Sequence, residues 1–562
     1  MGSIQKYQER RSSLRSERES FVQHWSDISE LLSPRLSRFF VTDRNRGDRR
    51  NQKIWNERAT IAHRTLRSGM MTGVSNPATK WAIIQTPDPD LNKYKPVKIF
   101  LNELENRMLK LLIRSNYYTT VPMVYGDQGW AGTSAFSALE DEETLLRSYH
   151  HPVGSYYVST DHRSVFNTFY RDFSMTAGQM ASQFPKDRLS TATRKLAGDK
   201  AGEDKWVDVC QAIEPNPDYD PRKAQFGYYK KFKSCFFESS GDQDKTLKES
   251  GFDVFPAVIT RWDTVGEDIY GSNCPGMEAL GSVRQLQLRE KRKSQLIDKA
   301  VSPAMVAPAS LRNQRSSILS GGITYLDATG GNQKFEPAYM PRGDFYQWVL
   351  QDIASLEERI SRVYFEDLFL MLVNNRRSNT TAREIAELHE EKLFQLGPVL
   401  MRQNDEHFDR LFDIEFSLMA KNRLLPKIPK ELEKMELQIE YVSVLAQAMK
   451  MVGVSAIDRG VRFGREMFQV WPEVRNAINP YNAVSEYFSI IGAPPSILLD
   501  EGEFNEKMQA EQEAAAKAQQ AAMMTEILPK AASSVKALAD ADMEGDNALS
   551  RMSGMMSGQQ AA

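Results

Sequence analysis

Residues 277–300 read MEALGSVRQLQLREKRKSQLIDKA, and residues 343–372 read GDFYQWVLQDIASLEERISRVYFEDLFLML. The first stretch follows Pro275-Gly276, which suits the start of a helix, and both stretches are predicted to be long helices. Between them, residues 301–342 are rich in proline and glycine, which indicates a compact insert of turns and short strands such as ITYLD at 323–327. This order of helix, insert and helix is the feature from which the fold is inferred.

The two helices of this hairpin differ in charge. Basic residues outnumber acidic ones in 277–300, and acidic residues outnumber basic ones in 343–372. Such helices can pair within one chain or between neighbouring copies, although two unrelated amphipathic helices would show the same pattern. Exposed ion pairs are individually weak, so they would set orientation and register more than stability. The residues predicted to take part are Arg284, Arg289, Lys291, Arg292, Lys293, Glu357, Glu358, Glu366 and Asp367.

A polar loop at residues 373–381 follows the hairpin and contains Asn374, Asn375, Arg376 and Arg377. The two arginines are candidates for contacting an anionic ligand, or they cap and pair with acidic helix ends. The next helix is predicted to run to about residue 421, with an interruption at Gly397-Pro398.

The N-terminal half is predicted to be mixed in structure. Phe21, Trp25, Ile28 and Leu31 recur at helical spacing, and Pro34 ends this helix. A basic segment between residues 44 and 67 is either a binding surface or a solvated helix face. Short strands are predicted from about residue 150 to 265, in SYYVSTD (155–161), SVFNTFYRDF (164–173) and FDVFPAVITRWD (252–263).

The C-terminal part is predicted to be helical from 441 to 500, with breaks at prolines. Beyond residue 503 the chain becomes rich in alanine, glutamine, glutamate and methionine, a composition with high helix propensity. The last residues have the composition of a disordered tail.

Composition limits the possible classes of protein. The chain has 562 residues, of which 41% are hydrophobic and 26% charged, with a formal net charge of -2. It is therefore not a globally basic nucleic-acid binder, and any contact with nucleic acid must be local. No run of eighteen apolar residues predicts a membrane span, and the first twenty residues lack the apolar core of a secretory signal. Three scattered cysteines fit a reducing compartment without a disulfide framework.

The sequence contains no recognised catalytic motif. It has no G-x-x-x-x-G-K-[ST] phosphate loop, no H-E-x-x-H, no C-x-x-C and no G-x-S-x-G. The seven histidines are dispersed, so neither a metal site nor a cofactor site is predicted. These absences favour a protein that is not an enzyme.

Several segments resemble the head-to-tail connector, or portal, family of short-tailed bacteriophages. They are SGMMTGVSNPATKWAIIQTPD (68–88), YGDQGWAGTSAFSALEDEE (125–143), DIYGSNCPGMEALGSVRQLQ (268–287), NTTAREIAE (379–387) and LGPVLMRQNDEHFDRLFDIEFSLMAKNRLLPKIP (396–429). The chain departs from the family pattern at Ser272, where an arginine is frequent, and at Asn422-Arg423, which replace a glycine-containing element. The matching order and spacing extend over most of residues 60–430.

The resemblance implies a mainly helical α+β portal fold that assembles as a closed ring, typically of twelve subunits. It implies a wing at 1–276, stem helices at 277–300 and 343–372, and a clip at 301–342. A tunnel loop would follow at 373–381, and a wing helix with its return at 382–440. The crown would occupy 441–520, with a partly disordered tail or a barrel at 521–562.

The resemblance also implies partners and a location. Double-stranded DNA would pass through the ring without sequence recognition, near the tunnel-loop residues. A terminase motor, and later a tail adaptor, would dock on the clip, for which the candidate residues are Arg312, Arg315, Tyr325 and Lys334. Major capsid and scaffolding proteins would be further partners at a capsid vertex, after assembly in the host cytoplasm.

Two other interpretations remain open from sequence. One is a different ring-forming tail adaptor or internal virion protein, although such chains are usually shorter and lack the helix–insert–helix order. The other is a DNA-processing enzyme with an unrecognised carboxylate site.

Overall fold

The computed structural model describes residues 3–39, 50–240, 246–303, 305–306, 336–337, 343–374, 382–432 and 437–447, with scattered positions between 463 and 518. The chain divides into two compact units, Met1–Gly453 and Val454–Ala562. In the second unit the described residues are helical, and the rings of Tyr481 and Phe504 lie 5.4 Å apart. All further description concerns the first unit.

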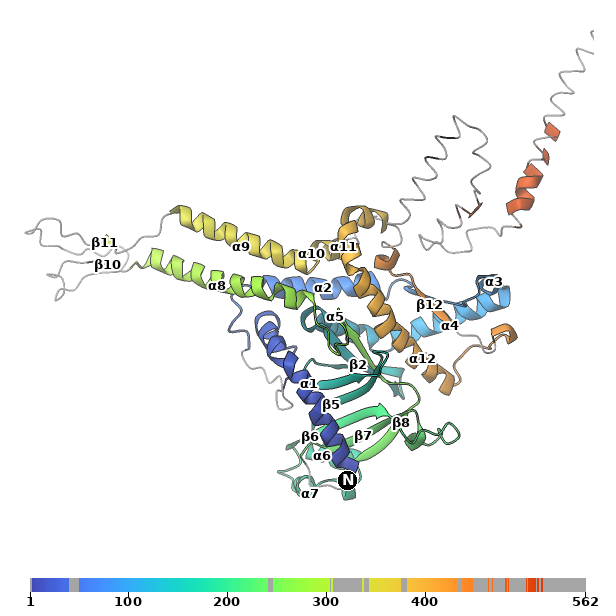
Figure 1. The fold of residues 1–562 in the computed structure, drawn as a ribbon, viewed down its shortest axis with the longest axis horizontal. Coiled ribbons are helices and arrows are strands. Elements are labelled where there is room, and N and C mark those ends of the chain that lie inside the picture. Colours follow the sequence, from blue (N-terminus) through green and yellow to red (C-terminus); the bar gives the residue numbers. More distant parts are fainter. Residues whose placement is uncertain are drawn as a thin grey trace, which may run out of the picture. The chain divides into compact units, whose positions relative to one another are not determined.

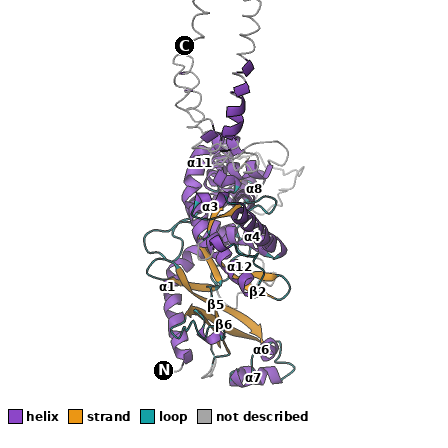
Figure 2. Cartoon of the chain, turned by 90° about the vertical axis from the view of Figure 1, so that its right-hand side faces the viewer, coloured by secondary structure: helices purple, strands orange, loops and turns teal. Residues whose placement is uncertain are grey.

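The N-terminal helix α1 (Ser3–Leu32) confirms the helical spacing of its apolar residues. Trp25, Ile28 and Leu32 are buried, and the indole of Trp25 donates a hydrogen bond to the carbonyl of Ala131 at 2.9 Å. The helix ends just before Pro34, as predicted. Figure 2 shows α1 running beside the sheet that contains β5 and β6, and its contacts with β4 place it against that sheet.

Two antiparallel sheets form the strand-rich part. The larger follows the order β4-β5-β6-β7-β8, and the smaller follows β3-β2-β9. Strands are confirmed in all three predicted segments, but the strand-rich part begins at Thr133, earlier than residue 150. The bounds are β2 (Thr133–Asp141), β3 (Leu145–His151), β4 (Tyr156–Thr160), β5 (Phe166–Thr176), β6 (Trp206–Pro215), β7 (Phe232–Glu238), β8 (Lys248–Phe252) and β9 (Ala257–Arg261), with helices α6 (Ala177–Gln183) and α7 (Thr191–Gly198) between β5 and β6.

A group of helices shares the main hydrophobic core with the smaller sheet. Helix α5 is buried along most of its length, so few of its positions are polar and solvated. It ends at Gly132, which has a φ of +74° and lies against the carbonyl of Gly271, a position that requires glycine. The remaining elements are α2 (Arg58–Val74), β1 (Ala82–Gln85), α3 (Pro89–Lys93), α4 (Lys95–Arg114), α5 (Tyr117–Ala131) and β12 (Gln438–Tyr441), and β1 pairs with β12.

Helices α8 (Pro275–Val301) and α9 (Gly343–Val363) lie side by side and form the predicted hairpin (Figure 1). The prediction of one helix over 343–372 is wrong, because the helix stops at Val363 and α10 (Glu366–Asn374) begins after a sharp bend. Phe365 at the bend has a φ of +52°, the left-handed conformation that an α-helix cannot contain. No glycine or proline marks this position in the sequence.

Helix α11 (Ala382–Arg402) runs through Gly397-Pro398, so the predicted interruption there is wrong. The irregularity comes later, where a π-helical segment (Gln403–Phe408) precedes α12 (Asp409–Lys421). A proline removes one backbone donor from a helix, and buried side chains around it compensate for that loss. Those side chains are Leu393, Leu396, Val399 and Leu400.

Candidate functional site

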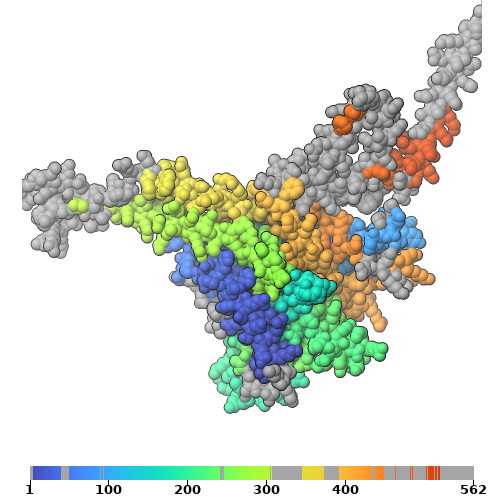
Figure 3. All heavy atoms as spheres, viewed as in Figure 1, coloured from blue at the N-terminus to red at the C-terminus, as the bar shows by residue number. Residues whose placement is uncertain are grey.

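The candidate site is the α8–α9 hairpin with the elements that anchor its base. Figure 3 shows the atoms of α9 lying along those of α8 as one continuous surface. At the far end of the hairpin, β10 (Met305–Val306) pairs with β11 (Glu336–Pro337) in antiparallel fashion. This pair joins the two ends of the predicted insert.

A short segment before α2 holds the two helices together near the base. The side-chain amide of Asn56 donates to Glu290 of α8 at 3.1 Å and to Glu357 of α9 at 2.9 Å. The buried side chain of Gln287 accepts from the backbone N–H groups of Trp55 and Asn56, and donates to the Asn56 carbonyl at 2.8 Å. One asparagine therefore links both helices, and one glutamine fixes the segment that carries it.

One ion pair crosses the hairpin among the described residues, between Arg289 and Asp352 at 2.9 Å. Lys293 instead pairs with Glu290 in its own helix, and Glu358 pairs with Arg362. Pairing of opposite charges between neighbouring copies stays a prediction.

Several of the other predicted charges contact elements outside the hairpin. Arg284 pairs with Asp27 of α1 at 2.7 Å, and Asp367 pairs with Lys392 of α11. The ammonium group of Lys291 lies 5.9 Å from the ring centre of Trp55, and Arg292 is exposed on α8. Most of these charges therefore fasten the hairpin to its surroundings.

Helix α2 supports the bend between α9 and α10. Arg58 at its start donates to the hydroxyl of Ser361 before the bend and to the buried carboxylate of Glu366 after it. A Cβ atom on Gly69 would lie 2.3 Å from the side chain of Phe369, so the two helices touch closely there. These contacts explain why the chain bends at Phe365 without a sequence signal.

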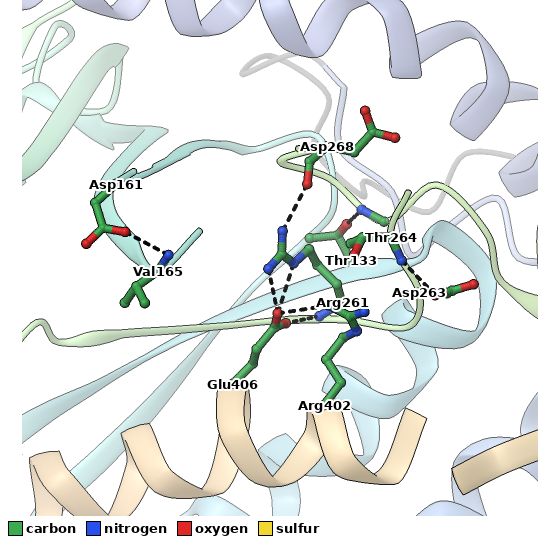
Figure 4. A network of polar contacts seen from close by, with 10 residues as sticks. Thr133, Asp161, Val165, Arg261, Asp263, Thr264, Asp268, Arg402 and Glu406 are labelled. Atoms are coloured by element: carbon green, nitrogen blue, oxygen red, sulfur yellow. Dashed lines mark hydrogen bonds and ion pairs between the residues drawn. The ribbon is translucent and has the colours of Figure 1, made fainter. Parts of the chain in front are cut away.

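A second anchoring contact connects the π-helical segment to β9, the strand that precedes α8 in the chain (Figure 4). Glu406 accepts from the guanidinium of Arg261 at 3.0 and 2.6 Å and from the backbone N–H of the same residue at 2.8 Å. Arg261 also donates to the carbonyl of Asp268 at 2.9 Å. Because the side chains of Arg261 and Glu406 are only 6% and 14% exposed, water screens this pair little.

Two buried titratable groups lie in the π-helical segment and in α12. The imidazole Nε2 of His407 lies 3.0 Å from the hydroxyl of Tyr117, and burial lowers the pKa of His407 to about 3. Burial also raises the pKa of Glu415 well above its ordinary value, and its carboxyl oxygens have no hydrogen-bond partner among the described residues. Burial therefore favours the neutral form of both groups, and His407 is neutral near pH 7.

Sequence reasoning missed Asn56, Gln287, Arg261 and Glu406, and it placed Arg58 in the basic segment without identifying its partner. Gln287 and Glu406 lie within segments that resemble the connector family, but that resemblance assigned no role to either residue. The partners of these five residues lie 145 to 308 positions away in the chain, so no local pattern could have identified them.

Part of the predicted site lies outside the described residues. Asn374 is the last residue of α10, whereas Asn375, Arg376 and Arg377 are not described. The predicted docking residues Arg312, Arg315, Tyr325 and Lys334 are also outside, as is most of the predicted crown. Their roles stay predictions.

The described part of the chain contains no group of three or more His, Cys, Asp or Glu side chains that could hold a metal ion. None of its helices is long and apolar enough to cross a membrane. Cys210, Cys235 and Cys274 are buried and unbonded, and burial raises the pKa of Cys235 and Cys274 to about 12. These thiols are therefore poor nucleophiles at neutral pH.

Comparison with known proteins places the chain in a family. It is 41% identical over 536 residues to the "Portal protein" of Salmonella phage epsilon15, covering 95% of each chain. It is 38% identical over 549 residues to the "Probable portal protein" of Bordetella phage BPP-1, covering 97% of each chain. The family model described as "Bacteriophage head to tail connecting protein" matches residues 4–498. The chain therefore belongs to the bacteriophage head-to-tail connecting protein family.

Proposed function

We propose that this protein is a phage portal protein, the subunit of a ring at one capsid vertex that serves as the channel for DNA packaging and ejection. The observation that carries the proposal is the near-complete overlap with two phage proteins named as portal proteins. A shorter tail adaptor would not align along 95% of such chains. The proposed role is structural, with no resident cofactor and no catalysis.

The proposed assembly is a closed ring of twelve copies. A cyclic ring needs two different surfaces on each subunit that fit one another by rotation. The hairpin offers an acidic and a basic helix for such a contact, because Arg292 and Glu358 are exposed on different helices. In this assignment α8 and α9 are the stem, the elements before them and α11–α12 form the wing, and residues 441–520 form the crown.

Asn374, Asn375, Arg376 and Arg377 are proposed to face the DNA in the channel. Arginine binds phosphate oxygens and asparagine donates to them, without reading sequence. A few such contacts per subunit would guide the duplex, whereas many would hold it too tightly for passage. Support comes from the position of this segment between α10 and α11, immediately beyond the anchored bend.

The insert at 301–342 is proposed to be the docking surface for a terminase motor during packaging and for a tail adaptor afterwards. Major capsid and scaffolding proteins would contact the ring at the vertex of the virion, after assembly in the host cytoplasm. The absence of a nucleotide-binding motif from the sequence fits an external motor.

Negative-stain microscopy of the purified chain, over a series of protein and salt concentrations, tests the ring. Rings with a central hole are expected, and a monomer under all conditions, including with scaffolding protein added, would contradict the proposal. A nuclease and ATPase assay with divalent metal tests the enzyme alternative. Activity that copurifies with the chain and is abolished by a point substitution in it would favour that alternative.

A further inference from the structure

A polar cavity of about 390 Å³ opens beside the larger sheet, away from the hairpin. Its walls come from the segment after α1, from the end of β3 and from β5, and they include Arg38, His151, Arg171 and Phe173. The backbone N–H of Arg38 donates to the carbonyl of Val153 at 3.0 Å, which fixes one wall to the other. The cavity is therefore built by elements that are distant in sequence.

Arg171 is the unusual group in this cavity. Its Nε donates to the side chain of Gln211 at 2.7 Å, and its guanidinium lies 4.7 Å from the ring centre of Phe173. Burial lowers the pKa of Arg171 to about 10. Among the residues that the structure describes, no carboxylate forms an ion pair with Arg171, so a largely desolvated charge lacks a counter-ion.

The nearest carboxylate in sequence is already engaged. Asp172 accepts two hydrogen bonds from Arg11 of α1, at 2.9 and 2.6 Å, and a third from the hydroxyl of Tyr157 at 2.9 Å. Gln211 is itself held by a hydrogen bond to Ser234 at 3.1 Å, which keeps its oxygen toward Arg171. The two terminal nitrogens of Arg171 are thus left for a ligand.

The surroundings favour a single carboxylate over a phosphate. Two guanidinium nitrogens match the two oxygens of a carboxylate. Asp172 lines the same cavity and would repel a dianion more than a monoanion. The ring of Phe173 and the half-exposed Trp206 offer apolar surface for the methylene groups of a glutamate. Binding to a nucleic-acid backbone would need a row of exposed cations, whereas Arg38 is the one exposed arginine or lysine among the described residues that line this cavity.

We propose that this cavity is a docking site for a glutamate side chain of a protein partner, held by Arg171 and, at the mouth, by Arg38. The residues that line it belong neither to the proposed tunnel loop nor to the proposed docking insert. A bound carboxylate would supply the counter-ion that Arg171 lacks.

Isothermal titration of the full chain with the peptide N-acetyl-Gly-Glu-Gly-amide tests the proposal. Binding is expected to weaken at least tenfold for the glutamine peptide and for the Arg171→Met variant. Arg163→Met is the matched control, because Arg163 is an exposed arginine on the β4–β5 turn that pairs with Asp161, and it should bind the peptide normally. Without ligand, Arg171→Met should melt no lower than the parent chain, since a buried unpaired charge has been removed.

Other arms of the experiment can overturn the proposal. The proposal is contradicted if the glutamate peptide does not bind. It is also contradicted if inorganic phosphate or a short DNA duplex binds more tightly than the peptide does and this binding depends on Arg171. Asp43 and Asp48 are the nearest acidic residues after Arg38 in the sequence. Tighter peptide binding by the Asp43→Asn/Asp48→Asn variant would mean that the chain fills its own cavity, which also contradicts a partner site.

Discussion

The carboxylate of Glu406 receives three hydrogen bonds from Arg261, two from its guanidinium and one from its backbone N–H. Arg261 is the last residue of β9, and Glu406 lies in the π-helical segment between α11 and α12. The strand that leads toward α8 is therefore locked to the helix that follows the predicted tunnel loop. If the loop and the hairpin act together during DNA passage, this pair is a rigid link between them.

Glu406→Gln should lower the free energy of unfolding of the first unit by about 3 kcal/mol, because it leaves the buried guanidinium of Arg261 without a counter-charge. Glu358→Gln is the control, since its pair with Arg362 is exposed and should contribute less than about 1 kcal/mol. Chemical denaturation measures the free energy of unfolding of both variants. Equal losses in the two variants would show that the Arg261–Glu406 pair is not a buried link.

Gly69→Ala should destabilise the α2–α10 contact by about 1–3 kcal/mol, because the new methyl group would overlap the side chain of Phe369. The matched control is Gly281→Ala in α8, where a Cβ would meet no described atom outside its own helix backbone within 4 Å and helix propensity should improve stability by about 1 kcal/mol. The melting temperatures of the two variants are compared by thermal denaturation of the unassembled chain. An unchanged melting temperature for Gly69→Ala would refute the close contact.

Stability should fall as the pH drops below about 6.5, the value for an exposed histidine. Burial lowers the pKa of His63, His151 and His407, so each binds a proton in the unfolded chain before it does so in the folded one. Between its unfolded and its folded pKa, each histidine lowers the free energy of unfolding by up to about 1.4 kcal/mol per pH unit. For His407 this loss continues down to its folded pKa of about 3.

Denaturation of the parent chain and of His407→Asn between pH 5 and 6.5 measures this effect. The free energy of unfolding of the variant should depend less steeply on pH than that of the parent, by the contribution of one histidine. This difference in slope does not depend on the absolute stability of the variant. Identical slopes would mean that His407 is accessible to protons in the folded chain.

Glu415→Gln should stabilise the chain above pH 7. Burial raises the folded pKa of Glu415, so its contribution is complete below the unfolded pKa of about 4.5 and is lost as pH rises toward the folded value. The loss is about 1.4 kcal/mol per pH unit, and glutamine cannot ionise. Measurements between pH 7 and 9 avoid the titration of the buried histidines. A variant no more stable than the parent at pH 8 would show that the pKa of Glu415 is not raised in the folded state.

Arg376→Ala/Arg377→Ala should form normal rings but alter DNA retention, if these residues face the duplex in the channel. Packaged DNA length and its release on salt challenge, scored in particles complemented with the variant, measure the effect. Arg359→Ala, which removes an exposed arginine from α9, is the control. Normal packaging and retention by the double variant would contradict the proposal that these arginines face the DNA.

Local patterns in the sequence determined the elements whose causes are themselves local. Pro34 ends α1 because proline cannot continue a helix, and alternating aromatic and β-branched residues form β4 and β5. The helix–insert–helix order followed from two long helices separated by prolines and glycines. The same reasoning placed a break at Pro398, where burial of neighbouring leucines overrides the loss of one backbone hydrogen bond.

Only the tertiary structure decided where the hairpin bends and which charges pair. A left-handed Phe365 costs about 1–2 kcal/mol, and it is tolerated because Tyr364, Phe369 and the Arg58–Glu366 pair hold both sides of the bend. Helical spacing relates residues three or four positions apart, whereas Arg58 and Glu366 are 308 positions apart. Such pairs depend on how complete helices and strands pack against one another. The sequence alone therefore determined the helices of the hairpin, whereas tertiary packing determined the contacts that hold them in place.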